Sequence, residues 1–500
     1  MASPPNLLLI TTDQHRFDAL GCMGSAEVQT PHLDRLAAEG VLFERCYVTN
    51  PVCMPSRASF LSGQYPDAHG VRRNGIPVPD APHGLARALS RQGYRTGMVG
   101  KTHFAALRRD YDPGYQFPDW HSGDDYFGFG TQAITHDLKD YLSTVPTQTR
   151  PQPDQPAPER AFVLDDYLEW LQAQHPASYR LAVREGLPEG QRPLAPELWT
   201  SALPADLHQS TWIADRTLAF IDQQREEPFF AWCSFVDPHH PFTAPHAYRE
   251  RYDPAAFAPP LWEDGELAQR SRFHQERHQH GSGHFREHWR EYRAQYYAML
   301  SLIDEQVGRL MQRLVERGLA EQTLVVFTAD HGELLGDHGL ARKGLFHYEP
   351  LIRVPLLLRW PGQCAAGSRQ PGIVQTVDIT ATLLAAAGIA PELPYQGISL
   401  LPWCRGERHD APRACALVTN GGEGPHYDPW PELRTLVTER WKLHYYVGED
   451  HLELDDLTND PAELHPAPIQ ERPALVQHLL RQLIDAGSAA SVWRQQVGRW

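Results

Sequence analysis

The feature that most constrains the fold is a series of short apolar runs, each followed by polar residues. The first run, NLLLITT at residues 6–12, leads directly into the polar segment 13–16. An unbroken apolar run of this length is typical of a parallel strand that is buried on both faces. The later runs are RTGMVG at 95–100, FFAWCSFV at 229–236, TLVVFTA at 323–329 and VPLLLRW at 354–360.

Helical patterns lie between these runs, for example at residues 296–317 and 377–387. An earlier helix is indicated by Thr30 and Pro31, which suit the N-cap and the first turn, and by Gly40, which ends it. Strands that alternate with helices predict an α/β fold with a mostly parallel central sheet, covered by helices on both faces.

Polar groups follow four of the expected strands. In an open parallel sheet, ligands bind beyond the carboxyl ends of the strands. Chemistry is therefore expected from the groups at residues 13–16, 101–103, 237–240 and 330–331.

The pattern changes near residue 400, which predicts a catalytic α/β domain over 1–400 and a smaller α+β subdomain over 401–500. Within the second part, residues 434–447 alternate like antiparallel strands of a short sheet. Residues 453–460 resemble a turn, and 473–486 resemble a terminal helix.

Two insertions are expected in the larger domain, at about 118–210 and 255–295. The second contains a His- and Arg-rich stretch at 264–293. Its histidines have irregular spacing and are interrupted by Gly281 and Gly283, which favours a solvated loop or a lid over a second metal site. These histidines are His274, His278, His280, His284 and His288.

Composition excludes several classes of protein. The 500 residues carry 46 Lys and Arg against 62 Asp and Glu, a net charge of −16, which argues against a nucleic-acid partner. A local cluster of cations can still bind an anionic substrate. No apolar run is long enough to cross a membrane, and the first ten residues lack the features of a secretory signal.

Seven cysteines without a CxxC pair argue against a disulfide scaffold or a zinc-thiolate site. Reduced thiols and the missing signal lead us to expect a cytoplasmic protein. The sequence leaves a homo-oligomer open.

The most informative segment is Cys53-Met54-Pro55-Ser56-Arg57. Pro55 suits the first turn of a helix, so Cys53 is expected at the amino end, where backbone N–H groups and the helix dipole favour an anion. Taken alone, a cysteine such as Cys53 is usually a partly buried structural residue before a helix. Nothing nearby resembles the signatures of cysteine proteases.

This segment matches C-x-P-S-R, the signature of the sulfatase family, at every defined position. The chain resembles that family over most of its length, in GKTHF at 100–104, DPHHPF at 237–242, TADHGE at 328–333, RKGLFHYEPLIRVPLL at 342–357 and TERWKLHYY at 438–446. The resemblance implies an alkaline phosphatase-like fold and hydrolysis of a small-molecule sulfate ester.

In the family, a formylglycine-generating maturation enzyme oxidises the cysteine of this signature, here Cys53. The aldehyde hydrates to a geminal diol. One hydroxyl attacks sulfur and displaces the alcohol, and the second expels sulfate. The reaction needs a Lewis acid, cations around the sulfuryl oxygens, a base and an acid.

The resemblance also implies a metal site formed by Asp13, Gln14, Asp330, His331 and the modified Cys53. Ligands rich in oxygen suit Ca²⁺, and Mn²⁺ or Mg²⁺ remain alternatives. Gln14 departs from the family pattern, because many sulfatases carry Asp at this position. Its amide oxygen can bind a cation, but with one less negative charge.

Three residues are expected to act close to the nucleophile. Arg57 lies one helical turn beyond Cys53, on the same face of the helix, and resembles the family arginine that steadies the diol. Lys101 and His103 lie on one side of an extended segment. The resemblance implies that Lys101 binds a sulfate oxygen and that His103 takes the proton of the diol.

Further residues are expected to bind the substrate. The family pattern P-H-x-P selects His239 for contact with sulfate and protonation of the leaving group, with His240 as its rival. Lys343 resembles the lysine that bridges sulfate and the leaving oxygen. His347 is a further candidate for the same cleft.

Three alternative functions remain open. The first is a phosphonate monoester or phosphodiester hydrolase of the same superfamily, which the ligand set with Gln14 resembles, whereas Lys101 and His103 resemble sulfatases. The second is a non-catalytic anion-binding protein on this fold. The third is a phosphatase that uses unmodified Cys53.

Overall fold

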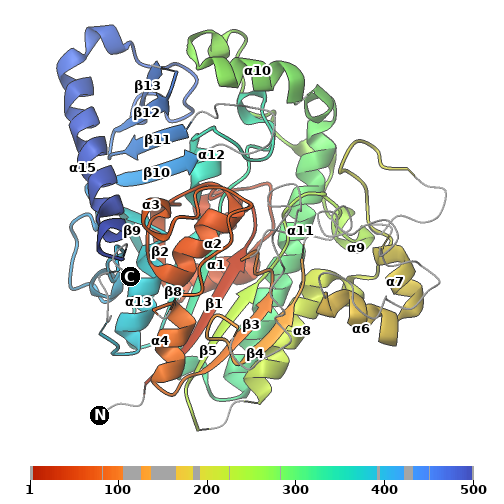
Figure 1. The fold of residues 1–500 in the computed structure, drawn as a ribbon. Helices are drawn as coiled ribbons and strands as arrows, with labels where there is room; N and C mark the ends of the chain where they lie inside the picture. Colours follow the sequence, from red (N-terminus) through yellow and green to blue (C-terminus); the bar gives the residue numbers. More distant parts are fainter. Residues whose placement is uncertain are drawn as a thin grey trace.

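Within the residues that it describes, the computed structural model shows a large sheet of nine strands and a small sheet of four (Figure 1). The insertion expected at about 118–210 lies partly outside the described residues. The structure describes residues 4–81, 83–104, 126–136, 165–183, 192–223, 226–281, 283–390, 395–421, 432–449 and 451–497.

The large sheet has the order β4-β3-β5-β1-β6-β8-β2-β7, and β9 pairs with β2. Its strands are β1 (Asn6–Thr12), β2 (Val41–Tyr47), β3 (Arg95–Gly100), β4 (Thr131–Ile134), β5 (Phe229–Ser234), β6 (Thr323–Ala329), β7 (Arg353–Val354), β8 (Leu356–Arg359) and β9 (Ser368–Gln375). Pairing is parallel from β4 through β6, whereas β8 is antiparallel to both β6 and β2. The predicted α/β class with a mostly parallel sheet is confirmed.

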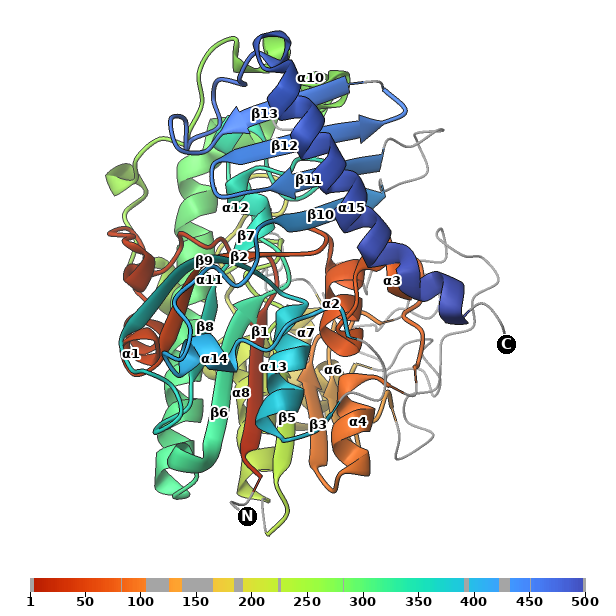
Figure 2. The same cartoon turned by 90° about the vertical axis from the view of Figure 1, so that its left-hand side faces the viewer.

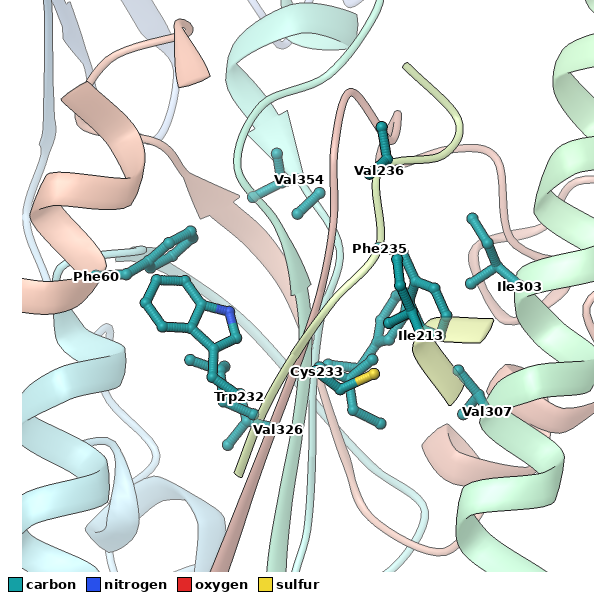
Figure 3. Packing of buried hydrophobic residues seen from close by; sticks show 14 of the residues in the cluster. Phe60, Ile213, Trp232, Cys233, Phe235, Val236, Ile303, Val307, Val326 and Val354 are labelled. Carbon is teal, nitrogen blue, oxygen red and sulfur yellow. The ribbon is translucent and has the colours of Figure 1, made fainter. Parts of the chain in front are cut away.

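Strand β5 shows why the central runs are apolar throughout. Its Trp232 packs edge-on against Phe60 of α2 (Cys53–Ser62), with ring centroids 6.1 Å apart. Cys233 points to the opposite face, towards Ile213 of α8 (Gln209–Asp222) (Figure 3). Because successive side chains alternate and both faces are covered, no position of the strand can be polar without a buried partner.

Helices cover the large sheet on both sides (Figures 1 and 2). One face carries α2, α4 (Leu85–Arg91) and α13 (Asp378–Ala386), and the other carries α1 (Pro31–Ala38), α8 and α11 (Gly283–Glu316). The other α-helices of the described residues are α3 (Pro66–His69), α6 (Asp166–Gln174), α7 (Pro176–Ala182), α9 (His246–Arg249), α10 (Arg272–Gly281), α12 (Glu349–Ile352), α14 (Leu401–Cys404) and α15 (Pro473–Val497). Among the described residues, no helix combines the length and apolar character needed to span a membrane.

The small sheet is antiparallel, as predicted for residues 434–447, and α15 packs on it (Figure 2). Its strands are β10 (Ala416–Gly421), β11 (Glu432–Val437), β12 (Trp441–Val447) and β13 (His451–Asp456). The turn predicted at 453–460 is wrong in its first part, because β13 runs through residue 456. Its acidic residues Glu453 and Asp455 are buried against Arg270, a partner that local sequence does not reveal. The boundary near residue 400 stays a prediction.

The loop predicted for the histidines of the stretch 264–293 is also wrong, whereas the alternative of a lid stays a prediction. This stretch forms α10 and the beginning of α11. His274 is buried, and its Nδ1 lies 3.1 Å from Ser271 Oγ and 3.2 Å from Tyr446 Oη. The side chain of His280 lies outside the described residues. Contacts with the small sheet, such as that of His274 with Tyr446, stabilise this helix. Gly281 and Gly283 had favoured a loop.

A buried lysine links the small sheet to the large domain. Lys442 of β12 is fully buried, and its Nζ lies 2.8 Å from Glu349 and 2.6 Å from Glu463. Burial alone would lower the pKa of Lys442, but these two carboxylates raise it. The lysine therefore stays charged and holds α12 against the sheet.

We expect Lys442→Met to lower the free energy of unfolding by about 3 kcal/mol, because two buried carboxylates lose their cation. Urea denaturation followed by tryptophan fluorescence measures the loss. Arg440→Met is the matched control, since Arg440 pairs with Asp456 near the same hairpin but is half exposed. The control should cost much less, because an ion pair exposed to solvent contributes little to stability. Equal losses in both variants would contradict a special role for Lys442.

Candidate active site

The polar groups predicted to carry chemistry lie together at the carboxyl ends of the central strands of the large sheet. The strand register places Thr11 of β1 opposite Ser234 of β5 and Thr328 of β6, so these strands end level with one another. Strand β3 ends at the same level, where Gly100 pairs with Ser234. The residues that follow these strands are Asp13, Gln14, Lys101, His103, His239, Asp330 and His331.

Cys53 lies in the middle of this group, as the first residue of α2. Its side chain is fully buried. The sulfur lies 2.6 Å from Lys343 Nζ, 3.3 Å from His331 Nε2 and 3.7 Å from Asp13 Oδ1. The signature cysteine thus faces a cation, an imidazole and a carboxylate from three other parts of the chain.

The charges around Cys53 favour an anion at this position. Burial and the charge of Asp13 both act to raise the pKa of the thiol. The cations Lys343 and Lys101, together with His331, outweigh them and hold this pKa well below its usual value. A negative charge is therefore stabilised here despite complete burial.

Arg57 joins the two carboxylates of the site. Its side chain is fully buried, with Nε 2.8 Å from Asp330 Oδ2 and Nη2 3.3 Å from Asp13 Oδ2. Nη1 donates to the carbonyl of Lys101 at 2.7 Å and to Ser234 Oγ at 2.8 Å. Because Arg57 follows Cys53 by four residues, the same turn of α2 that presents the sulfur also fixes the carboxylates.

The ligand atoms of Asp13, Cys53, Asp330 and His331 all lie within 4.8 Å of one another. Burial and the charge of Asp13 raise the pKa of Asp330, whereas Lys101 and other cations hold that of Asp13 well below its usual value, although burial opposes them. Two carboxylates in one buried site repel each other, and a hard divalent cation would relieve this repulsion. The residues fit such an ion.

Gln14 supports this fit. Its side chain is fully buried, and its Oε1 is a buried oxygen without a hydrogen-bond partner. The backbone N–H of Gln14 donates to Asp330 Oδ1 at 3.1 Å, which holds the residue beside the carboxylates. A buried unpaired oxygen is costly unless a ligand satisfies it.

Lys343 and the two histidines form the next part of the site. Lys343 Nζ lies 3.2 Å from His239 Nε2 and 3.2 Å from His331 Nε2. The His239 and His240 rings stack with centroids 4.0 Å apart, but His240 Nδ1 faces Gln14 Nε2 at 3.3 Å. The geometry thus favours His239 over His240 for contact with the reacting group.

Lys101 and His103 follow the end of β3. Lys101 Nζ lies 2.7 Å from Asp13 Oδ2. The side chain of His103 lies within hydrogen-bonding reach of Cys53. Burial and the charge of Lys101 lower the pKa of His103, so its imidazole is held neutral and can accept a proton.

His347 is a correction to the expected site. Its Nδ1 lies 2.7 Å from Thr435 Oγ1 in β11, and its backbone carbonyl accepts a hydrogen bond from Lys442. The ring therefore packs against the small sheet instead of joining the group around Cys53. The contact with Thr435, 88 residues further along the chain, is one that the local sequence does not reveal.

Sequence reasoning gave no role to two further residues. Asn74 Oδ1 accepts the backbone N–H of Met54 at 3.1 Å and supports the first turn of α2. Glu333 lies inside the TADHGE segment, two residues after His331, and is fully buried next to Gln14. The TADHGE motif could have pointed to Glu333, whereas no sequence motif marks Asn74.

A second group of ligand-type residues, His444, Asp455 and Glu463, lies at the small sheet. Arg270 Nη1 lies 3.0 Å from Asp455, and Lys442 Nζ lies 2.6 Å from Glu463. These cations already neutralise the carboxylates, so this group is an ion network.

The comparisons with known proteins agree with this geometry. A sulfatase family model matches residues 5–389, and a model of the N-sulphoglucosamine sulphohydrolase C-terminal region matches residues 336–489. The chain is 28% identical to an arylsulfatase of Clostridium perfringens, covering 92% of this chain and 89% of that protein. It is 29% identical to the multifunctional alkaline phosphatase superfamily protein PehA of Trinickia caryophylli, over 80% of this chain and 76% of that protein. The crystal structure of a phosphonate monoester hydrolase of Agrobacterium radiobacter superposes with a TM-score of 0.80 at 26% identity, covering 97% and 96%.

We expect chelated protein to gain stability when a divalent cation is restored. A cation at 100 times its dissociation constant adds about 2.7 kcal/mol, because it binds only the folded chain. Thermal melting with Ca²⁺, Mn²⁺ and Mg²⁺ measures the gain, and Asp330→Asn should remove most of it. Asp304→Asn is the control: Asp304 is buried but bonds the backbone N–H groups of His32 and Leu33. An equal gain in both variants would place the cation elsewhere.

Proposed function

Because the chain belongs to the sulfatase family and is a sulfuric ester hydrolase, we propose that it cleaves sulfate monoesters through a formylglycine made from Cys53, beside a divalent cation. The observation that carries the proposal is the place of Cys53. It lies at the amino end of α2, fully buried between Lys343, His331 and Asp13. A maturation enzyme would have to install the aldehyde.

The cation would be held by Asp13, Gln14, Asp330 and His331, and would supply positive charge to the nucleophile and the sulfuryl oxygens. Its identity is proposed as Ca²⁺, with Mn²⁺ and Mg²⁺ as alternatives, because three of the four ligands offer oxygen. The hydrated aldehyde would supply the attacking hydroxyl and a second hydroxyl that releases sulfate.

Binding of the sulfate group falls to the protein's cations. Lys343 lies 2.6 Å from the Cys53 sulfur, and Lys101 lies 2.7 Å from Asp13 Oδ2. Both side chains are fixed by ion pairs or hydrogen bonds, and Lys101 is buried whereas Lys343 is partly buried. Charges held in this way stabilise a developing anion without having to reorganise.

Proton transfer is assigned to the two histidines. Neutral His103, within reach of residue 53, would take the proton of the diol hydroxyl that expels sulfate. His239 Nδ1 donates to the carbonyl of His240 at 2.6 Å, which turns Nε2 towards Lys343. The pair of Lys343 and His239 would then deliver a proton to the leaving oxygen.

A second function has support of its own. The superposition on a phosphonate monoester hydrolase and the presence of Gln14 favour hydrolysis of phosphonate monoesters or phosphodiesters by the same nucleophile. The pair of Lys101 and His103 beside Cys53 favours sulfate esters, since it resembles the sulfatase pattern. The two functions differ in which substrate the same site prefers.

We expect matured enzyme to show a kcat/KM for p-nitrophenyl sulfate at least about tenfold above that for a phenyl phosphonate ester, which corresponds to about 1.4 kcal/mol in transition-state binding. Steady-state kinetics on both substrates gives the ratio. A preference for the phosphonate ester would reverse the assignment.

The matched control for this measurement is the pair Cys53→Ala and Cys415→Ala. Cys53→Ala should abolish both activities, whereas Cys415 is half-buried beside the small sheet and its loss should change neither. Full activity in Cys53→Ala would exclude residue 53 as the nucleophile.

A further inference from the structure

The amide of Gln14 uses its nitrogen and leaves its oxygen unpaired. Nε2 donates to Glu333 Oε2 and lies 3.3 Å from His240 Nδ1. Oε1 is buried without a hydrogen-bond partner. Because a carboxylate can only accept, the atom that faces Glu333 must be the nitrogen. The oxygen is therefore the atom available to a cation.

The backbone of Gln14 is also fixed. Its φ of 68° lies in the left-handed region, which is unfavourable for a side chain of this size. Its N–H donates to Asp330 Oδ1 at 3.1 Å, and its carbonyl accepts from Tyr296 Oη at 2.7 Å. Because both backbone groups are bound, the orientation of the side-chain amide decides whether its oxygen or its nitrogen faces the cation.

Glu333 is placed to decide that orientation. It is fully buried. Its Oε1 accepts the backbone N–H groups of Leu335 at 2.9 Å and Arg342 at 2.5 Å. Two backbone donors thus fix the carboxylate, and Oε2 is the oxygen left to face Gln14. The same contact with Arg342 ties this carboxylate to the loop that carries Lys343.

We propose that Glu333 is a positioning residue of the metal site: it fixes the Gln14 amide so that Oε1 faces the cation. This role rests on the proposed metal-dependent function. It also accounts for glutamine where many sulfatases carry aspartate, because a carboxylate at position 14 would meet the carboxylate of Glu333 without a proton donor between them.

The proposal makes a specific prediction for Glu333→Gln, which keeps the shape of the side chain. The new amide must keep its oxygen on the N–H groups of Leu335 and Arg342, so its nitrogen faces Gln14. Two donors then oppose each other, and the Gln14 amide turns its nitrogen towards the cation. We expect the dissociation constant for Ca²⁺ and for Mn²⁺ to rise at least about tenfold, as is typical when a partner of a metal ligand is lost.

Titration calorimetry of chelated, full-length protein measures this constant, and thermal melting without metal checks that each variant is folded. The decisive comparison is the same substitution in Gln14→Ala protein. If Glu333 acts through Gln14, Glu333→Gln changes the constant there by less than about threefold. An equal loss in both backgrounds would mean a general structural effect and would overturn the proposal.

A second double variant tests the direction of the hydrogen bond. In Gln14→Glu with Glu333→Gln, the amide at 333 donates to the carboxylate at 14, whose other oxygen again faces the cation. We expect binding no weaker than in the wild type. Binding as weak as in Glu333→Gln alone, or unchanged binding in Glu333→Gln, would contradict the inference while leaving the proposed reaction intact. Wild-type protein that binds none of Ca²⁺, Mn²⁺ and Mg²⁺ would contradict both.

Discussion

The active site depends on the buried contact of one arginine with two carboxylates. Asp13 and Asp330 end neighbouring strands of the parallel sheet, and Arg57 reaches both from the first turns of α2. Without Arg57, two buried negative charges would face each other, a situation that costs several kcal/mol. With it, α2 is held at the edge of the sheet, and Cys53 is placed between the carboxylates and Lys343.

The same constraint extends to the opposite side of the site. The chain that leaves β6 carries Asp330, His331 and Glu333 and then returns with Lys343 before it reaches α12. Backbone hydrogen bonds of Gly332 and Glu333 to Leu351 and Pro350 hold this loop against α12. Because Lys442 binds Glu349 of α12, the small sheet supports the loop that carries half of the site. The buried ion pair of Lys442 and Glu349 therefore links the small sheet to the loop that follows β6.

Much of this architecture can be predicted from the sequence, because the central strands depend on local patterns. The apolar run at 323–329 predicted a strand, and β6 has the same bounds. Pro55 predicted that a helix begins near Cys53, as α2 does. The failures occur where distant partners override the local pattern. The acidic residues of β13 predicted a turn, because the sequence does not show that Arg270 neutralises them. The His-rich residues of α10 predicted a loop, because the sequence does not show that this helix packs on the small sheet. His347 was misplaced for the same reason, since Thr435 binds its ring.

The central claim is that the thiol of residue 53 is converted to an aldehyde in the active enzyme. Mass spectrometry of the peptide that spans Cys53, taken from protein with measured sulfatase activity, tests it most directly. We expect a mass about 18 Da below that of the thiol form, in a fraction that rises with specific activity. An unmodified cysteine in fully active enzyme would contradict the account.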